Sequence, residues 1–312
     1  MATRLAAILL GLSAAFFFAL AGYLQQRAAR VTERRGRTVI SGLSSLMARL
    51  LRSRTWLLGW VVNLLGFGAQ AVALHFGSIA LVQPLLATQL LFALPMSCLE
   101  LRRWPKGKDW AAGAAICGGL VVLLVSLGST PLDGRPDRGR ILLAVGIVLT
   151  LVALLLAVAR HLRPGLFNLL SAGAAGLCFA MTAVFIKLTG DDLLHGGVLH
   201  TATDWPGYAL AASTMLGLVL EQGAFANGPL PWAIATKDSV NPIASFAIGV
   251  LAFSVVLPAD AAHLGAIATA AALLILGAIG LAHSPSAHLW LRRDPALGTG
   301  LEAGVGPRPI AS

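Results

Sequence analysis

The sequence predicts an all-α polytopic membrane protein with about nine transmembrane helices, arranged as two inverted four-helix repeats that are linked by an unpaired fifth span. Three observations support this fold class. Of the 312 residues, 57% are hydrophobic and only 12% are charged, whereas a soluble domain carries about 25% charged residues. Apolar runs of about twenty residues, long enough to cross a bilayer, recur along the chain. Short motifs of the first half also return in the second half, as in transporters that are built from repeats.

The apolar runs predict one transmembrane domain over residues 1–283. The expected spans are 5–24, 56–76, 79–99, 110–128, 141–159, 166–188, 207–225, 231–257 and 262–282. The first repeat would cover 5–128, span 141–159 would connect the halves, and the second repeat would cover 166–282. The first span resembles a secretory signal, but it continues into Gln25, Gln26 and Arg27, so it is expected to be a true span. Residues 284–312 are rich in glycine, proline and alanine and are expected to form a disordered cytoplasmic tail.

Two proline motifs mark the repeat. V-Q-P at 82–84 and V-N-P at 240–242 lie 158 residues apart, and each is embedded in an apolar span. A proline inside a helix removes one backbone donor and crowds the carbonyl four residues earlier. We therefore expect Pro84 and Pro242 to kink or break their helices. Because the fifth span has no counterpart, the second repeat would enter the membrane from the opposite side, as in alternating-access transporters.

Basic residues predict the orientation in the membrane, because they favour the cytoplasmic side. The loop 25–55 carries eight arginines and one acid, and segment 99–109 carries four basic residues. With the N-terminus outside and the C-terminus inside, seventeen basic residues lie inside and four outside. The second part of loop 25–55 also has apolar residues at helical spacing, which predicts an interfacial amphipathic helix against anionic lipids.

Polar residues within the spans are the candidate site, because ionisable groups at membrane depth are rare and usually face a cavity or a partner. The candidates are Gln70, Gln83, Glu221, Gln222, Lys237, Asp238 and Asn241. Glu221 either reaches the cytoplasmic interface or binds a proton or cation. Lys237 either pairs with Asp238 as a structural plug or receives an anionic substrate. In inverted repeats, Glu221 and Asp238 would lie on the inner side of one central cavity, and Gln70 and Gln83 on its outer side.

Other polar residues are given structural roles. Gln89, in the third span, is expected only to bond one helix to another. A polar group follows the sixth span: Asp191, Asp192, His195, His200 and Asp204. Its spacing matches no strong metal-ligand pattern, so a solvated extracellular turn is favoured over a cation site. The three cysteines lie in apolar spans without paired spacing and imply neither a disulfide nor a metal.

Two further stretches complete the pattern: A-L-H-F-G-S-I-A-L-V-Q-P at 73–84, and E-Q-G-A-F-A-N-G-P-L at 221–230 followed by D-S-V-N-P-I-A-S-F-A-I-G at 238–249. With the nine-span plan, they resemble the drug/metabolite transporter superfamily, and within it the NIPA-like branch and its actinobacterial relatives. The resemblance covers roughly residues 5–283. It implies a multi-pass protein of the bacterial plasma membrane. The commoner plan has a tenth span, which would supply a dimer contact. This chain lacks that span, so the resemblance allows a homodimer but does not require one.

The resemblance implies a secondary, non-ATP transporter that moves a small polar or lipid-linked metabolite by alternating access. A NIPA-like magnesium or divalent-cation permease is the alternative, with Glu221 and Asp238 as the carboxylates, although Lys237 opposes a cation. The sequence contains no Walker loop, catalytic triad or metalloprotease motif, so neither enzymatic activity nor a cofactor is expected. The net charge is +10, but the basic residues lie between the apolar spans, which argues against a nucleic-acid partner.

Overall fold

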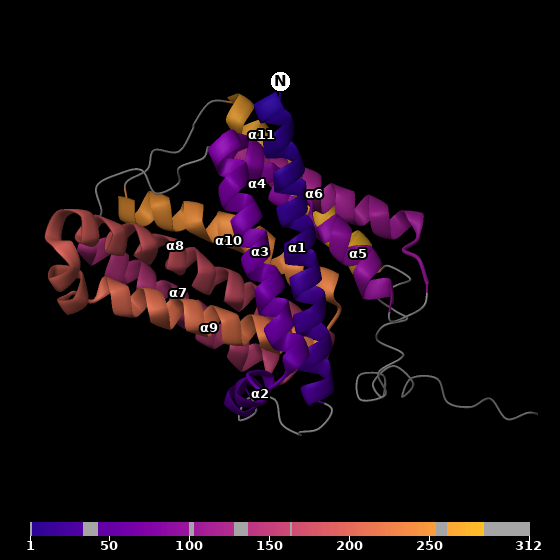
Figure 1. The fold of residues 1–312 in the computed structure, drawn as a ribbon, viewed down its shortest axis with the longest axis horizontal. Coiled ribbons are helices and arrows are strands. Elements are labelled where there is room, and N and C mark those ends of the chain that lie inside the picture. Colours follow the sequence, from indigo (N-terminus) through magenta and orange to yellow (C-terminus); the bar gives the residue numbers. More distant parts are fainter. Residues whose placement is uncertain are drawn as a thin grey trace, which may run out of the picture.

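The computed structural model describes residues 2–33, 43–99, 103–127, 137–162, 164–253 and 261–283. Within these residues the chain forms eleven α-helices and no strand (Figure 1). They are α1 Ala2–Glu33, α2 Leu43–Leu50, α3 Arg54–Phe76, α4 Ile79–Ala87, α5 Gln89–Leu99, α6 Gly107–Leu127, α7 Arg138–Ala159, α8 Pro164–Thr203, α9 Pro206–Asn227, α10 Leu230–Phe253 and α11 Ala261–Ala282. The predicted tail at 284–312 and the end of the predicted span 231–257 lie outside the described residues.

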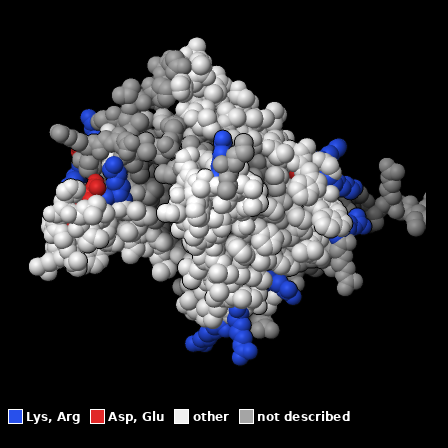
Figure 2. All heavy atoms as spheres, turned by 45° about the horizontal axis from the view of Figure 1, so that its top comes forward, with Lys and Arg blue, Asp and Glu red and all other residues white. Residues whose placement is uncertain are grey.

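The helices confirm a polytopic α-helical membrane protein. Eight segments among the described residues are long and apolar enough to cross a bilayer, and α10 is not one of them. Lys237, Asp238 and Asn241 interrupt the apolar sequence of α10. Large apolar side chains also face outward, and in Figure 2 wide areas without charged side chains separate groups of basic residues. Such a surface is stable in lipid, where exposed leucine and valine meet acyl chains and not water.

Two groups of helices make up the bundle. In Figure 1, α1 and α3 run side by side from top to bottom, and α7, α8, α9 and α10 lie across them on the left. One buried apolar cluster joins α1 and α3 to α5, α6, α11 and the near ends of α9 and α10. A second apolar cluster lies among α7, α8, α9 and α10. Because α9 and α10 contribute to both clusters, they connect the two groups.

The first and sixth predicted spans are longer than their apolar runs. α1 continues past residue 24 to Glu33, and α8 is 40 residues long, with a bend at Gly197. Gly197 has a φ of 74°, a conformation that glycine adopts without the steric cost of a Cβ. The segment after residue 188 is helical up to Thr203 apart from the bend at Gly197, so the expected turn is wrong, while residues 193–200 are exposed as expected.

The third predicted span is interrupted. α4 ends at Ala87 and α5 begins at Gln89, three and five residues after Pro84. At the interruption, the Thr88 backbone N–H donates to Leu85 O at 3.1 Å, a tighter turn than the α-helix makes. Pro84 lies inside α4, and Pro242 lies inside α10, which continues through it as one helix. Neither proline therefore ends its helix, and a kink at either position stays a prediction.

The expected amphipathic helix of loop 25–55 corresponds to α2, and residues 34–42 before it lie outside the described part. Leu46 and Leu50 of α2 are buried, with 8% and 0% of their surface exposed. They belong to the apolar cluster that contains α1 and α3. α2 packs on α1 and α9, with Arg49 on its exposed side.

Candidate functional site

Three charged residues of α9 and α10 form one ion-pair network. Lys237 Nζ lies 2.7 Å from Glu221 Oε1 and 3.6 Å from Asp238 Oδ1. The side chains of Lys237, Glu221 and Asp238 are only 22%, 12% and 20% exposed. One cation between two carboxylates leaves the group one positive charge short of neutrality. In a low-dielectric environment an uncompensated charge is costly, and one bound proton would neutralise this group.

The short link between α9 and α10 brings these residues together. Only Gly228 and Pro229 separate the two helices. Glu221 and Lys237 lie seven and eight residues from this link, and at a rise of 1.5 Å per residue they reach similar heights of about 10–12 Å above it. α8 fixes the other side of α10. A Cβ at Gly176 would lie 2.9 Å from Lys237 O, so only glycine permits this close approach of the two backbones.

A glutamine from the first half of the chain completes the network. Gln89 Nε2 donates a hydrogen bond to Asp238 Oδ2. Gln89 is the first residue of α5, directly after the interruption at Thr88. The aromatic ring of Phe179, from α8, has its centroid 5.9 Å from Lys237 Nζ. Sequence reasoning gave Gln89 only a helix-bonding role and did not single out Phe179. Both belong to the immediate surroundings of the charged group.

A second polar cluster is fully buried between α1, α3 and α9. Gln222 Nε2 donates to Gln25 Oε1 at 2.8 Å, and Trp56 Nε1 donates to Gln222 Oε1 at 3.1 Å. Gln222 is 1% exposed, Gln25 5% and Trp56 6%. Both ends of the Gln222 amide are therefore satisfied by side chains from other helices. The adjacent Gln26 Nε2 donates to Gly228 O at 2.7 Å and ties α1 to the α9–α10 link.

The Gln222 contacts lead to a stability prediction. Gln222→Leu should lower the apparent thermal unfolding midpoint in detergent more than Gln70→Leu does. The first change leaves Trp56 Nε1 and Gln25 Oε1 buried without a partner, at about 1–3 kcal/mol each. Gln70 is half-buried and makes no hydrogen bond among the described residues, so it is the matched control. Equal shifts of the midpoint would show that the buried cluster adds no stability.

The remaining candidates lie apart from the charged network. Gln70 of α3 and Gln83 of α4 are half-buried, and no hydrogen bond joins either of them to Lys237 or its partners within the described residues. Asn241 lies one turn after Lys237 on α10 and accepts from Ser245 Oγ at 3.4 Å. The structure thus brings Glu221, Lys237 and Asp238 together. The expected placement of Gln70 and Gln83 on the opposite side of a cavity stays a prediction.

A charged cluster also forms at the far end of α8. Arg138 Nη2 lies 2.7 Å from Asp204 Oδ2 and 3.8 Å from Asp192 Oδ1. The pKa of Asp204 is lowered, mainly by the hydrogen bond from the Trp205 backbone N–H and further by Arg138. Ligand atoms of Asp192, His200 and Asp204 lie within 4.8 Å of one another. The Arg138 guanidinium already supplies the positive charge between these carboxylates. The cluster is therefore a group of ion pairs that connects α7 to the end of α8 and the α8–α9 link.

One curated protein resembles the chain over most of its length. It is the uncharacterized protein Cgl0250/cg0304 of Corynebacterium glutamicum, which is 30% identical over 261 residues, covering 80% of this chain and 86% of the relative. The chain belongs to the family of this corynebacterial protein. No protein-family model matches the chain, and no solved structure matches it. Membership of this family therefore supports one shared fold over the membrane region, and the charged network is the feature from which a function has to be inferred.

Proposed function

We propose that this protein is a secondary transporter of the drug/metabolite transporter type, which moves a small polar or lipid-linked metabolite across a bacterial plasma membrane by alternating access. The charged network of Glu221, Lys237, Asp238 and Gln89 carries this proposal. It is an ion-pair group with a net negative charge in a chain whose surface is otherwise suited to lipid. Charged groups at membrane depth are retained mainly where they bind a solute or a coupling ion.

The position of the network supports alternating access. Gln89 belongs to the first half of the chain, and Glu221, Lys237 and Asp238 belong to the second. The hydrogen bond from Gln89 to Asp238 therefore crosses the boundary between the halves. A solute that binds Lys237 would compete with the carboxylates, change this contact and so change how the halves fit together. Coupling of this kind requires a ligand that interacts differently with the two arrangements.

The helix pairs support an inverted repeat as part of this proposal. α1 packs extensively on α3, and their expected counterparts α8 and α9 pack on each other in the same way. The expected last helices of the two repeats, α6 and α11, also pack together, as do α5 and α10. Pairing of equivalent elements across one interface is expected for two repeats that are related by a pseudo-two-fold axis.

The orientation has a direct test. We expect the N-terminus outside, so a cysteine at Leu194 should react with a membrane-impermeant thiol reagent in intact cells, and one at Trp104 should not. Leu194 and Trp104 are 82% and 78% exposed, which makes them matched positions. The natural cysteines, all buried, would first be replaced by alanine. Reaction at Trp104 but not at Leu194 would reverse the topology.

A divalent-cation permease is the less favoured alternative. It would need Glu221 and Asp238 as oxygen ligands, because Mg²⁺ prefers carboxylate and water oxygens. Both carboxylates lie within 4.0 Å of Lys237 Nζ, whose ammonium group already occupies the position of a bound cation. We therefore favour a substrate that carries negative charge or hydrogen-bond acceptors, with Lys237 as the residue that receives it.

The transport proposal can be tested before the substrate is known. Proteoliposomes that contain the protein are incubated with a bacterial small-molecule extract, washed, and analysed by mass spectrometry. At least one polar or lipid-linked metabolite should accumulate with the wild-type protein and not in empty liposomes. A magnesium-sensitive dye inside parallel liposomes tests the alternative. Accumulation of neither metabolite nor cation would contradict the transporter proposal.

A further inference from the structure

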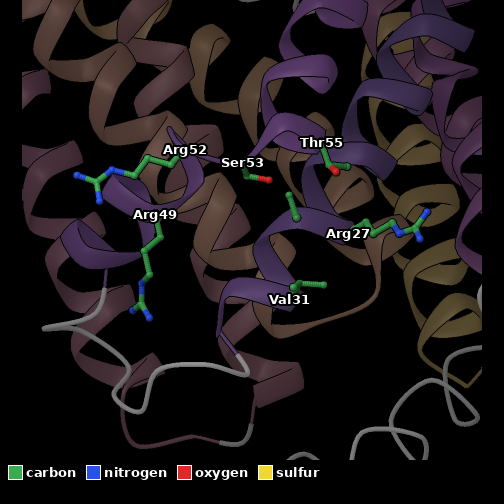
Figure 3. A pocket seen from close by; sticks show the side chains of 7 residues that line it. Arg27, Val31, Arg49, Arg52, Ser53 and Thr55 are labelled. Carbon is green, nitrogen blue, oxygen red and sulfur yellow. The ribbon is translucent and has the colours of Figure 1, made fainter.

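A hollow lined by arginines lies at the end of the α1–α3 pair. Its volume is about 630 Å³. The lining residues come from the last turns of α1, from α2, from the α2–α3 link and from the start of α3: Arg27, Ala28, Val31, Arg49, Arg52, Ser53 and Thr55. In Figure 3, Arg49 and Arg52 lie on one side of this hollow and Arg27 on the other, with Ser53 and Thr55 between them, and the three guanidinium groups point outward around its rim.

The chemistry of the lining favours an oxyanion. Arg27, Arg49 and Arg52 are all exposed, and none of the seven lining residues is acidic. A guanidinium group offers several N–H donors in a planar fork that matches the oxygens of a phosphate. Ser53 and Thr55 add hydroxyl groups, and Ser53 caps the start of α3, since its side chain accepts from Trp56 N at 3.4 Å. The positive end of the α3 dipole adds to the attraction for an anion.

The position of the hollow favours a lipid as the source of that phosphate. The apolar span of α1 ends at Val31, and the span of α3 begins at Arg54. The hollow therefore lies where two membrane spans end, which is the depth of the phospholipid headgroups. Val31, which lines it, is 53% exposed, and the α2–α3 link and the start of α3 carry the exposed Leu51 at 55% and Leu58 at 53%. They offer a surface to acyl chains, which free phosphate does not have.

We propose that this hollow binds the phosphate of an anionic phospholipid headgroup. Arg27, Arg49 and Arg52 supply the positive charge, and Val31 and its apolar neighbours receive the acyl chains. The site joins α1 to α2 and α3, so a bound lipid would hold the ends of these helices together. This inference goes beyond the transport proposal, because lipid binding at this site does not depend on a transported substrate.

The test uses the full chain, delipidated in detergent, with binding measured by native mass spectrometry. Phosphatidylglycerol, phosphatidylcholine with the same acyl chains, and inorganic phosphate are titrated separately. Wild-type protein should retain phosphatidylglycerol selectively. The variant Arg27→Gln/Arg49→Gln/Arg52→Gln should bind it about tenfold more weakly or worse, because the positive charge around the hollow is lost, and each basic residue near the headgroups contributes to the attraction. The control variant Arg4→Gln/Arg103→Gln/Arg160→Gln removes the same charge from exposed positions elsewhere and should bind like the wild type.

Three results would overturn the proposal. Equal loss in the two triple variants would mean that net charge alone attracts the lipid. Displacement of the lipid by inorganic phosphate at equal concentration would make free phosphate the ligand. A third variant, Val31→Trp, fills the hollow but keeps all three arginines, so it tests the site even if the arginine variant fails to fold. Unchanged phosphatidylglycerol selectivity in Val31→Trp would show that the lipid binds elsewhere.

Discussion

Replacing Lys237 by methionine is expected to abolish transport and to destabilise the protein by about 3–5 kcal/mol, the usual cost of removing one partner from a buried ion pair. The change leaves Glu221 and Asp238 close together without the cation that now lies 2.7 Å and 3.6 Å from them. Two carboxylates in a low-dielectric environment repel each other and have lost most of their hydration. The loss of stability would be measured as the apparent thermal unfolding midpoint in detergent.

Lys187 is the matched control for this prediction. Its Nζ lies 5.6 Å from the centroid of the Phe253 ring, much as Lys237 Nζ lies 5.9 Å from that of Phe179. Lys187→Met removes the same charge from the same half of the chain but breaks no ion pair among the described residues. It should shift the midpoint little and leave metabolite accumulation intact. Equal effects of both changes would mean that the ion pairs do not matter.

A triple variant separates stability from function. Lys237→Met/Glu221→Gln/Asp238→Asn replaces the whole charged group by neutral side chains of similar size. Such replacements are often neutral for stability, because no buried charge remains to be compensated. We therefore expect the midpoint to recover while metabolite accumulation stays at the level of empty liposomes. Recovery of accumulation would show that the charged group serves only as a structural plug.

Hydrophobicity predicts the helices well but not where they end. Each of the nine predicted spans overlaps helix among the described residues, because a run of about twenty apolar residues has few alternatives in lipid, but only eight segments are long and apolar enough to cross a bilayer. α1 nevertheless continues beyond its apolar run to Glu33. The reason is that Gln25 and Gln26 satisfy their amides with Gln222 and Gly228 in the packed interior. A local sequence pattern does not contain these partners, which lie about two hundred residues away.

In the candidate site, too, the sequence predicts the charged residues but not their contacts with distant parts of the chain. Glu221, Lys237 and Asp238 could be found from the sequence because charges within apolar runs are conspicuous. The role of Gln89 could not, since a membrane amide that bonds two helices looks the same as one that faces a charged site. The decisive contact, from Gln89 to Asp238, joins residues 149 positions apart. It depends on the interruption at Thr88, and its position follows from the packing of α5 on α10.

The second large effect is expected from Glu221→Gln, which should abolish proton-driven accumulation but retain exchange of substrate across the membrane. The charged group holds one cation and two carboxylates, so one bound proton makes it neutral. When Glu221 takes up that proton, Lys237 keeps only Asp238 as an ionic partner and becomes available to an anionic substrate. Glutamine imitates the protonated carboxyl in shape and hydrogen bonding but cannot release a proton. The variant would then exchange substrate across the membrane without moving a proton.

The measurement uses proteoliposomes and the metabolite that the extract experiment identifies. One set receives an inward proton gradient, and a second set is preloaded with unlabelled metabolite and given labelled metabolite outside. Glu221→Gln should lose accumulation in the first set and keep exchange in the second. Asp238→Asn is the comparison, because it removes the other carboxylate while leaving the 2.7 Å contact between Lys237 and Glu221 possible. If Glu221→Gln accumulates metabolite like the wild type, Glu221 does not carry the coupling proton. Loss in Asp238→Asn alone would assign that proton to Asp238.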